Sequence, residues 1–144
     1  MLYNFFEKNK FISVYLPLIS YWLVLFIATT LPAKQIPKTG MSDKIEHLLG
    51  YFLLTFLLSN ALYFQNKNEK IKRFPVSFAL IITAFYGMID ELHQYLIPGR
   101  YCDFYDWTAD VTGAIIAAIC YFIVKKYFQP VEDGQRSNLG NQES

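Results

Sequence analysis

A long uncharged segment near the start of the chain constrains the fold more than any other feature. Residues 11–31 contain no Asp, Glu, Lys, Arg or His. As an α-helix, these 21 residues would extend about 31 Å, which matches the hydrocarbon core of a bilayer. The segment is too long for the apolar part of a signal peptide, and no A-x-A cleavage pattern follows it. It is therefore predicted to be a retained membrane span, which Pro17 can kink.

Three further apolar segments follow, and each is long enough to cross a bilayer as a helix. They cover residues 46–64, 74–95 and 106–128. Asp43 and Glu46 have the spacing of a capping box, which predicts a helix start at that point. Pro75 suits the first turn of the next helix. The basic segment 65–73 between these helices is predicted to be a short loop.

These segments predict an all-α membrane protein. None of them alternates apolar and polar residues, so a membrane β-barrel is not supported, and residues 11–31 have no polar face for a soluble bundle. Residues 1–128 are expected to form a bundle of four transmembrane helices, and 129–144 a disordered polar tail. The formal net charge of +1 gives no reason to expect nucleic acid as a partner, whereas membrane lipids are expected neighbours.

Basic residues near the span ends predict the orientation in the membrane. Nine fall on one side: Lys8, Lys10, Lys67, Lys70, Lys72, Arg73, Lys125, Lys126 and Arg136. Four fall on the other: Lys34, Lys38, Lys44 and Arg100. This asymmetry places both termini and the 65–73 loop in the cytoplasm, and the 32–44 and 97–105 loops outside.

The same topology brings the polar residues of three spans to one membrane face. They are Asp43, Glu46, His47, Asp90, Glu91, Gln94, Arg100, Asp103, Asp106 and Asp110. Within each span they recur at i, i+3 and i+4, so they share a helix face. Gly113 and Ala117 form a small-xxx-small pair that favours close packing, so the acids before Gly113 are expected to point into the bundle. The last three spans should form a compact unit, with the first at its periphery.

Carboxylates outnumber fixed cations at this face. The seven carboxylates belong to Asp43, Glu46, Asp90, Glu91, Asp103, Asp106 and Asp110, and the two fixed cations to Lys44 and Arg100. A charge at the membrane centre costs about 2.5–3.5 kcal/mol, so protons or a bound cation are expected to reduce the excess. Oxygen ligands suit Mg²⁺, Ca²⁺ or Mn²⁺, and one imidazole also admits Zn²⁺. The candidate metal ligands are Asp90, Glu91, Asp103 and Asp106.

Three groups of residues carry a resemblance to a known family. The first is Asp43-Lys44-Ile45-Glu46-His47, which follows Leu31-Pro32 and Ile36-Pro37 and precedes Tyr51. The second is Asp90-Glu91-Leu92-His93-Gln94, with a Glu-x-x-Gln pattern, followed by Pro98-Gly99-Arg100. The third is Asp106-Trp107-Thr108-Ala109-Asp110-Val111-Thr112-Gly113-Ala114. In this order and spacing, residues 31–117 resemble the VanZ-like family of bacterial membrane proteins.

The resemblance implies a multi-pass protein of the bacterial cytoplasmic (inner) membrane. The family takes its name from a protein associated with low-level resistance to the glycopeptide antibiotic teicoplanin, so a similar link is an expectation here. One position departs from the family, whose members often carry Asn where this chain has Asp110. Either residue supplies a side-chain oxygen acceptor, whereas a neutral donor would require a protonated Asp110.

Three hypotheses for function remain open. In the first, a non-catalytic envelope protein binds a lipid-linked cell-wall precursor, another cell-wall ligand or a glycopeptide. The ligand-binding residues would be Asp43, Lys44, His47, Asp90, Glu91, Gln94, Arg100, Asp106 and Asp110. In the second, a metal-dependent phosphohydrolase or transferase acts on a prenyl-phosphate lipid. Arg100 would clamp the phosphate, and His47 or Glu91 would be the general base.

The third hypothesis is a small proton- or ion-coupled carrier that uses the same acids as a relay. The chain has no nucleophile motif, glycine-rich phosphate loop or Cys/His metal spacing that separates the three. A divalent cation is the one cofactor that the residues suggest. Arg100 also has a purely structural interpretation, as the counter-ion of the neighbouring acids.

Overall fold

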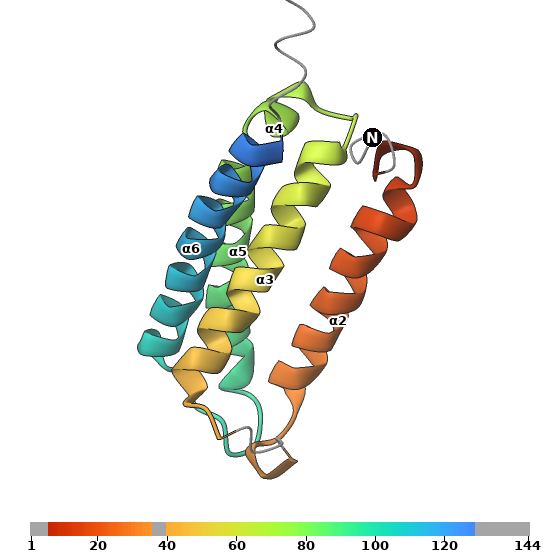
Figure 1. Ribbon diagram of the computed structural model, residues 1–144. Helices are drawn as coiled ribbons and strands as arrows, with labels where there is room; N and C mark the ends of the chain where they lie inside the picture. Colours follow the sequence, from red (N-terminus) through yellow and green to blue (C-terminus); the bar gives the residue numbers. More distant parts are fainter. Residues whose placement is uncertain (1–5, 36–39, 129–144) are drawn as a thin grey trace, which may run out of the picture.

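A computed structural model describes residues 6–35 and 40–128, and every regular element in these ranges is helical. Four helices are long and apolar enough to cross a membrane, over Phe11–Thr30, Asp43–Phe64, Pro75–Gln94 and Phe104–Lys125. The predicted all-α, four-span fold is therefore confirmed (Figure 1). The polar tail predicted for residues 129–144 lies outside the described residues.

The first span consists of a π-helical turn, η1 (Phe11–Tyr15), that continues into α2 (Leu16–Thr30). Pro17 lies in the first turn of α2 and has no N–H to donate to the turn before it. The disturbance expected at Pro17 thus takes the form of the wider π turn just ahead of it. After α2, the short 3₁₀ helix η2 (Ala33–Gln35) begins the connection to the second span.

The second span, α3 (Asp43–Phe64), begins three residues before the predicted start at residue 46. Ser42, with extended backbone angles, occupies the N-cap position, and its carbonyl accepts from the backbone N–H groups of Ile45 and Glu46. Asp43 is therefore the first helical residue, so it cannot serve as the cap of the expected Asp43–Glu46 capping box. That prediction was wrong in its register.

The basic segment predicted as a loop contains a short helix, α4 (Glu69–Arg73). Asn68 caps it, because its side-chain oxygen accepts from the backbone N–H groups of Lys70 and Ile71 at 2.9 and 3.2 Å. The third span, α5 (Pro75–Gln94), follows directly and has Pro75 in its first turn, as predicted. The fourth span, α6 (Phe104–Phe128), begins two residues before its predicted start.

Helices α3, α5 and α6 pack against one another as a three-helix unit, and α2 lies along the side of this unit (Figure 1). Buried residues make up 11% of the most apolar stretch of the first span, compared with 44%, 39% and 33% in the other three. The predicted peripheral position of the first span is confirmed.

Gly113 marks the closest approach of α6 to α3. A Cβ atom at this position would overlap the backbone carbonyl of Leu48, so the two backbones are in direct contact there. Ala114 and Ala117 are also fully buried beside this crossing. The small residues therefore serve the close packing predicted from their spacing, and the helix face that they share with Asp110 points into the unit.

Candidate functional site

A buried polar network occupies one end of the three-helix unit. At this end α3 begins, α5 ends and α6 begins (Figure 1). We call this the polar end. Its buried polar residues are His47, Asp90, Glu91, Gln94, Asp106 and Asp110. Side chains from three separate stretches of sequence thus meet in one layer, as the predicted topology requires. Asp43 and Lys44 lie at the exposed rim of this layer.

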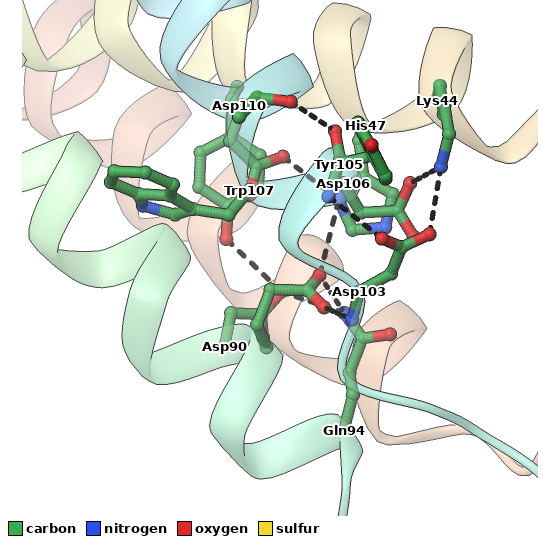
Figure 2. A network of polar contacts seen from close by, with 12 residues as sticks. Lys44, His47, Asp90, Gln94, Asp103, Tyr105, Asp106, Trp107 and Asp110 are labelled. Atoms are coloured by element: carbon green, nitrogen blue, oxygen red, sulfur yellow. Dashed lines mark hydrogen bonds and ion pairs between the residues drawn. The ribbon is translucent and has the colours of Figure 1, made fainter.

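Lys44 links the rim of the network to its interior. Its Nζ atom lies 3.0 Å from a carboxylate oxygen of Asp103 and 2.8 Å from one of Asp106 (Figure 2). Asp103 also accepts from the backbone N–H of Tyr105 at 2.8 Å, so it acts as the N-cap of α6. The Tyr105 N–H and then the Lys44 ammonium hold the pKa of Asp103 below its usual range.

His47 is the centre of the buried part of the network. Its Nδ1 atom lies 2.9 Å from Oδ1 of Asp110 and 3.8 Å from Oε1 of Glu91, so α3, α5 and α6 each contribute one residue. Its ring stacks at 6.4 Å on that of Tyr51, one turn along α3. Gly87 gives the Asp110 carboxylate its space, because a Cβ there would lie 2.8 Å from Oδ2 of Asp110.

Asp90 and Glu91 are held by hydrogen bonds from neighbouring residues. The Tyr51 hydroxyl donates to Oδ2 of Asp90 at 3.1 Å. The Gln94 amide donates to Asp90 at 3.3 Å and to Glu91 at 3.4 Å. The other Glu91 oxygen accepts from the backbone N–H of Asp103 at 2.9 Å. The Glu-x-x-Gln pattern on α5 is therefore a hydrogen-bonding unit that fixes the two acids.

Arg100 contacts backbone carbonyls rather than acids. Its Nη2 donates to the carbonyl of Ala28 at 3.0 Å and its Nε to that of Leu31 at 3.3 Å, which satisfies the exposed C-terminal end of α2. Its Nη1 donates to Oε1 of Gln94 at 3.1 Å. Within residues 6–35 and 40–128, Arg100 forms no ion pair with a carboxylate. Its geometry is that of a clasp between α2 and the network.

A cleft opens beside the polar end. Its volume is about 270 Å³, and we call it the site cleft. It is lined by Ala33, Asp43, Gln94, Gly99, Arg100, Tyr101, Asp103 and Asp106. Three carboxylates and one guanidinium thus face this space, which is slightly smaller than the roughly 300–1,000 Å³ of sites for drug-sized ligands.

Two groups of side chains in the described part of the chain are arranged so that they could hold a metal ion. One is His47, Glu91 and Asp110, and the other is Asp43, His47 and Asp106; in each, the ligand atoms lie within 4.8 Å of one another. The four ligands suggested by the sequence are therefore separated. Glu91 and Asp106 fall in different groups, and Asp90 and Asp103 belong to neither of the two.

Tyr51 and Gly87 are part of the network although neither was among the site residues chosen from the sequence. Their spacing from polar residues in the sequence could have identified both. Tyr51 follows His47 by four residues, and Gly87 precedes Glu91 by four, so each shares a helix face with a polar residue. The indole N–H of Trp107 donates to the Ala84 carbonyl at 3.0 Å, which links α6 to α5 near the network.

Comparison with known proteins agrees with the motifs. A family model described as VanZ/LLP1 matches residues 3–125, which is most of the chain. Searches of curated proteins and of solved structures find no match.

Proposed function

The chain belongs to the VanZ/LLP1 family, and from this membership and its geometry we propose that this multi-pass membrane protein binds a lipid-linked or cell-wall ligand. Part of the polar head of the ligand would occupy the site cleft, because a space of about 270 Å³ is too small for a whole disaccharide-peptide. The observation that carries the proposal is this cleft of about 270 Å³, which lies at the ends of the membrane spans and is lined by polar groups from α3, α5, α6 and the 95–103 connection. A bacterial cytoplasmic membrane, with the cleft on its outer face, is part of the proposal.

The lining favours ligand groups that donate hydrogen bonds. Asp43, Asp103 and Asp106 bring three carboxylates to the cleft, whereas Arg100 brings the one guanidinium. Sugar hydroxyls, amino groups and peptide amides suit such a surface. The exposed ring of Tyr101 at the rim offers a surface on which a sugar can pack. A lipid-linked cell-wall precursor combines such a head with an anchor in the membrane.

The position of Arg100 weighs against a phosphohydrolase that uses this residue as its phosphate clamp. All three of its nitrogen atoms already donate, to Ala28, Leu31 and Gln94. Three of its five N–H groups are thus in use, so a bidentate grip on phosphate is left with one N–H each on Nη1 and Nη2. Binding of a glycan or peptide head by the carboxylates of the lining does not depend on Arg100.

The depth of the network weighs against an ion carrier. The network extends inward from Lys44 to Tyr51, and the core beyond it contains side chains such as Leu54 and Leu58. Further along α3, Thr55 and Ser59 donate to carbonyls of their own helix at 2.8 Å. The described residues thus provide no continuous series of titratable groups to the opposite end, which a relay across the membrane requires.

A binding measurement with two lipids tests the proposal. The full-length protein in lipid nanodiscs is titrated with a lipid-linked disaccharide-peptide precursor and, separately, with the prenyl phosphate that lacks the glycan. We expect the precursor to bind, and Asp43→Asn and Tyr101→Ala each to weaken binding about tenfold, because both side chains line the cleft at exposed positions. Glu69→Gln, an exposed acid on α4, is the matched control.

Two results would overturn the proposal. One is equal binding of the prenyl phosphate and the precursor, which would favour phosphate chemistry. The other is precursor binding that is unchanged in both cleft variants. In cells, the same variants should abolish any effect of the protein on teicoplanin susceptibility while Glu69→Gln retains it.

A further inference from the structure

His47, Glu91 and Asp110 meet in the interior, with their candidate ligand atoms within 4.8 Å of one another. The three residues are 8%, 3% and 0% exposed. Nδ1 of His47 lies 2.9 Å from Asp110 and 3.8 Å from Glu91. Two atoms that bind one Zn²⁺ ion at about 2.1 Å are separated by roughly 3.0 Å at a right angle and roughly 3.4 Å at the tetrahedral angle. The observed separations lie on either side of these values.

The second oxygen of Asp110 provides an independent indication of a missing partner. Within the described residues Oδ2 has no hydrogen-bond donor, although Asp110 is fully buried. A buried polar atom without a partner is costly and calls for an explanation. This oxygen faces α5 at Gly87, and Glu91 lies one turn further along the same face. The Asp110 carboxylate thus lies between His47, which Oδ1 contacts, and the face of α5 that carries Gly87.

The local charge also lacks balance. Glu91 and Asp110 share the single imidazole of His47 as their ion-pair partner in the described part of the chain. Lys44 is engaged by Asp103 and Asp106, and Arg100 by carbonyls and Gln94. Two carboxylates with one imidazole at membrane depth favour an additional positive charge, and a divalent ion supplies it together with directional bonds.

We propose that His47, Glu91 and Asp110 bind a divalent transition-metal ion, with Zn²⁺ as the representative case. One imidazole and two carboxylates favour such an ion over Ca²⁺ or Mg²⁺, which prefer all-oxygen sites. The hydrogen bonds from Asp103 N–H and Gln94 to Glu91 orient this ligand, as outer-shell contacts do at metal sites. Three protein ligands leave a coordination position open.

Metal titration of the full-length protein tests this site. The protein is purified in detergent with a tag that contains no histidine, stripped with a chelator and titrated with Zn²⁺ by calorimetry. We expect one ion per chain, and an affinity at least tenfold lower in Asp110→Asn and in Glu91→Gln. Glu69→Gln, an exposed carboxylate at the opposite end of the unit, should bind as the wild type does.

A spectroscopic measurement on the unmutated protein covers the case in which the variants do not fold. X-ray absorption of the Zn²⁺-loaded protein should show one imidazole nitrogen among nitrogen and oxygen ligands. Absence of stoichiometric binding by the stripped wild type, undiminished binding in both variants, or a spectrum without imidazole would each overturn the proposal. The outcome is separable from that of the ligand proposal, because Tyr101→Ala should weaken precursor binding and keep its metal.

Discussion

At the polar end of the three-helix unit, α3, α5 and α6 enclose charged side chains, whereas at the opposite end the same helices enclose residues such as Leu58, Val76 and Ala118. The apolar end follows the usual pattern of a membrane bundle, in which small and aliphatic side chains pack without electrostatic cost. The polar end buries four carboxylates, and each of them needs a specific partner. Residues that are costly for stability and persist at membrane depth indicate function.

The largest effect concerns the compartment that the polar end faces. In intact cells, a membrane-impermeant maleimide should label the exposed Cys102, which lies beside the site cleft, in a Cys120→Ala background. A cysteine introduced at Lys70, in a variant without the two native cysteines, should be labelled only after the membrane is opened. The basis is the nine-to-four distribution of basic residues. Labelling at position 70 but not at Cys102 would place the polar end in the cytoplasm and remove the cell-wall ligand from reach.

The next largest effect is on the stability of the crossing between α3 and α6 at Gly113, which lies between the polar and the apolar end. Gly113→Ala should sharply lower the yield and the melting temperature in detergent, because the added Cβ overlaps the Leu48 backbone, which cannot move aside as a side chain can. Overpacking of this kind typically costs about 1–3 kcal/mol, and a backbone clash belongs at the upper end. Gly50→Ala on α3 is the matched control, since its Cβ would make an ordinary 3.4 Å contact with Leu25. Equal tolerance of both substitutions would show that α3 and α6 do not cross at Gly113.

Much of this arrangement could be predicted because two physical signals in the sequence are strong. Long apolar stretches give the number of spans, and the spacing of polar residues within each stretch gives the buried face. Both signals are periodic and local, so they identify His47, Glu91 and Asp110 as neighbours once the topology is known. The exact helix starts are less certain, because Ser42 and Asp43 are both good cap residues and their backbone angles decide which one serves.

The role of Arg100 could not be predicted for a different reason. Two of its partners are the backbone carbonyls of Ala28 and Leu31, about 70 positions earlier in the chain. Every residue has a carbonyl, so such a contact leaves no mark on residue type or spacing. The charge of Arg100 suggested the nearby acids as partners, whereas the planar guanidinium fits the unsatisfied end of a helix equally well.

Arg100 substitutions give the third prediction, because this residue joins α2 to the polar end. Arg100→Ala should lower stability by about 1.5–3 kcal/mol, the range for hydrogen bonds to a charged group, and should speed amide exchange near residues 28–33. Arg100→Lys should not restore the clasp, since one ammonium cannot span Ala28, Leu31 and Gln94. Thermal denaturation and hydrogen exchange in detergent measure both effects. Full recovery with Lys would identify Arg100 as a counter-ion and contradict the clasp.

The smallest expected effect is a pH dependence at the exposed rim of the polar end. The Tyr105 N–H and the Lys44 ammonium lower the pKa of Asp103 in the folded protein. A group of this kind stabilises the fold above its unfolded pKa of about 3.9, and the contribution is lost as the pH falls through the lower folded value. Asp103→Asn keeps a good N-cap and removes the charge, so the difference in melting temperature from the wild type isolates the electrostatic part.

This difference should be small and constant above about pH 5 and should shrink below about pH 4, because an exposed pair is screened by solvent and salt. Lys44→Met is the matched background. In that background the effect of Asp103→Asn on the melting temperature should be smaller, because the ion pair with Lys44 is already absent. The effect that remains comes from the Tyr105 N–H, the other stabilising partner. A difference that grows on acidification, or that is the same with and without Lys44, would mean that the rim ion pair contributes nothing to stability. The polar end would then be held together by its buried contacts around His47 alone.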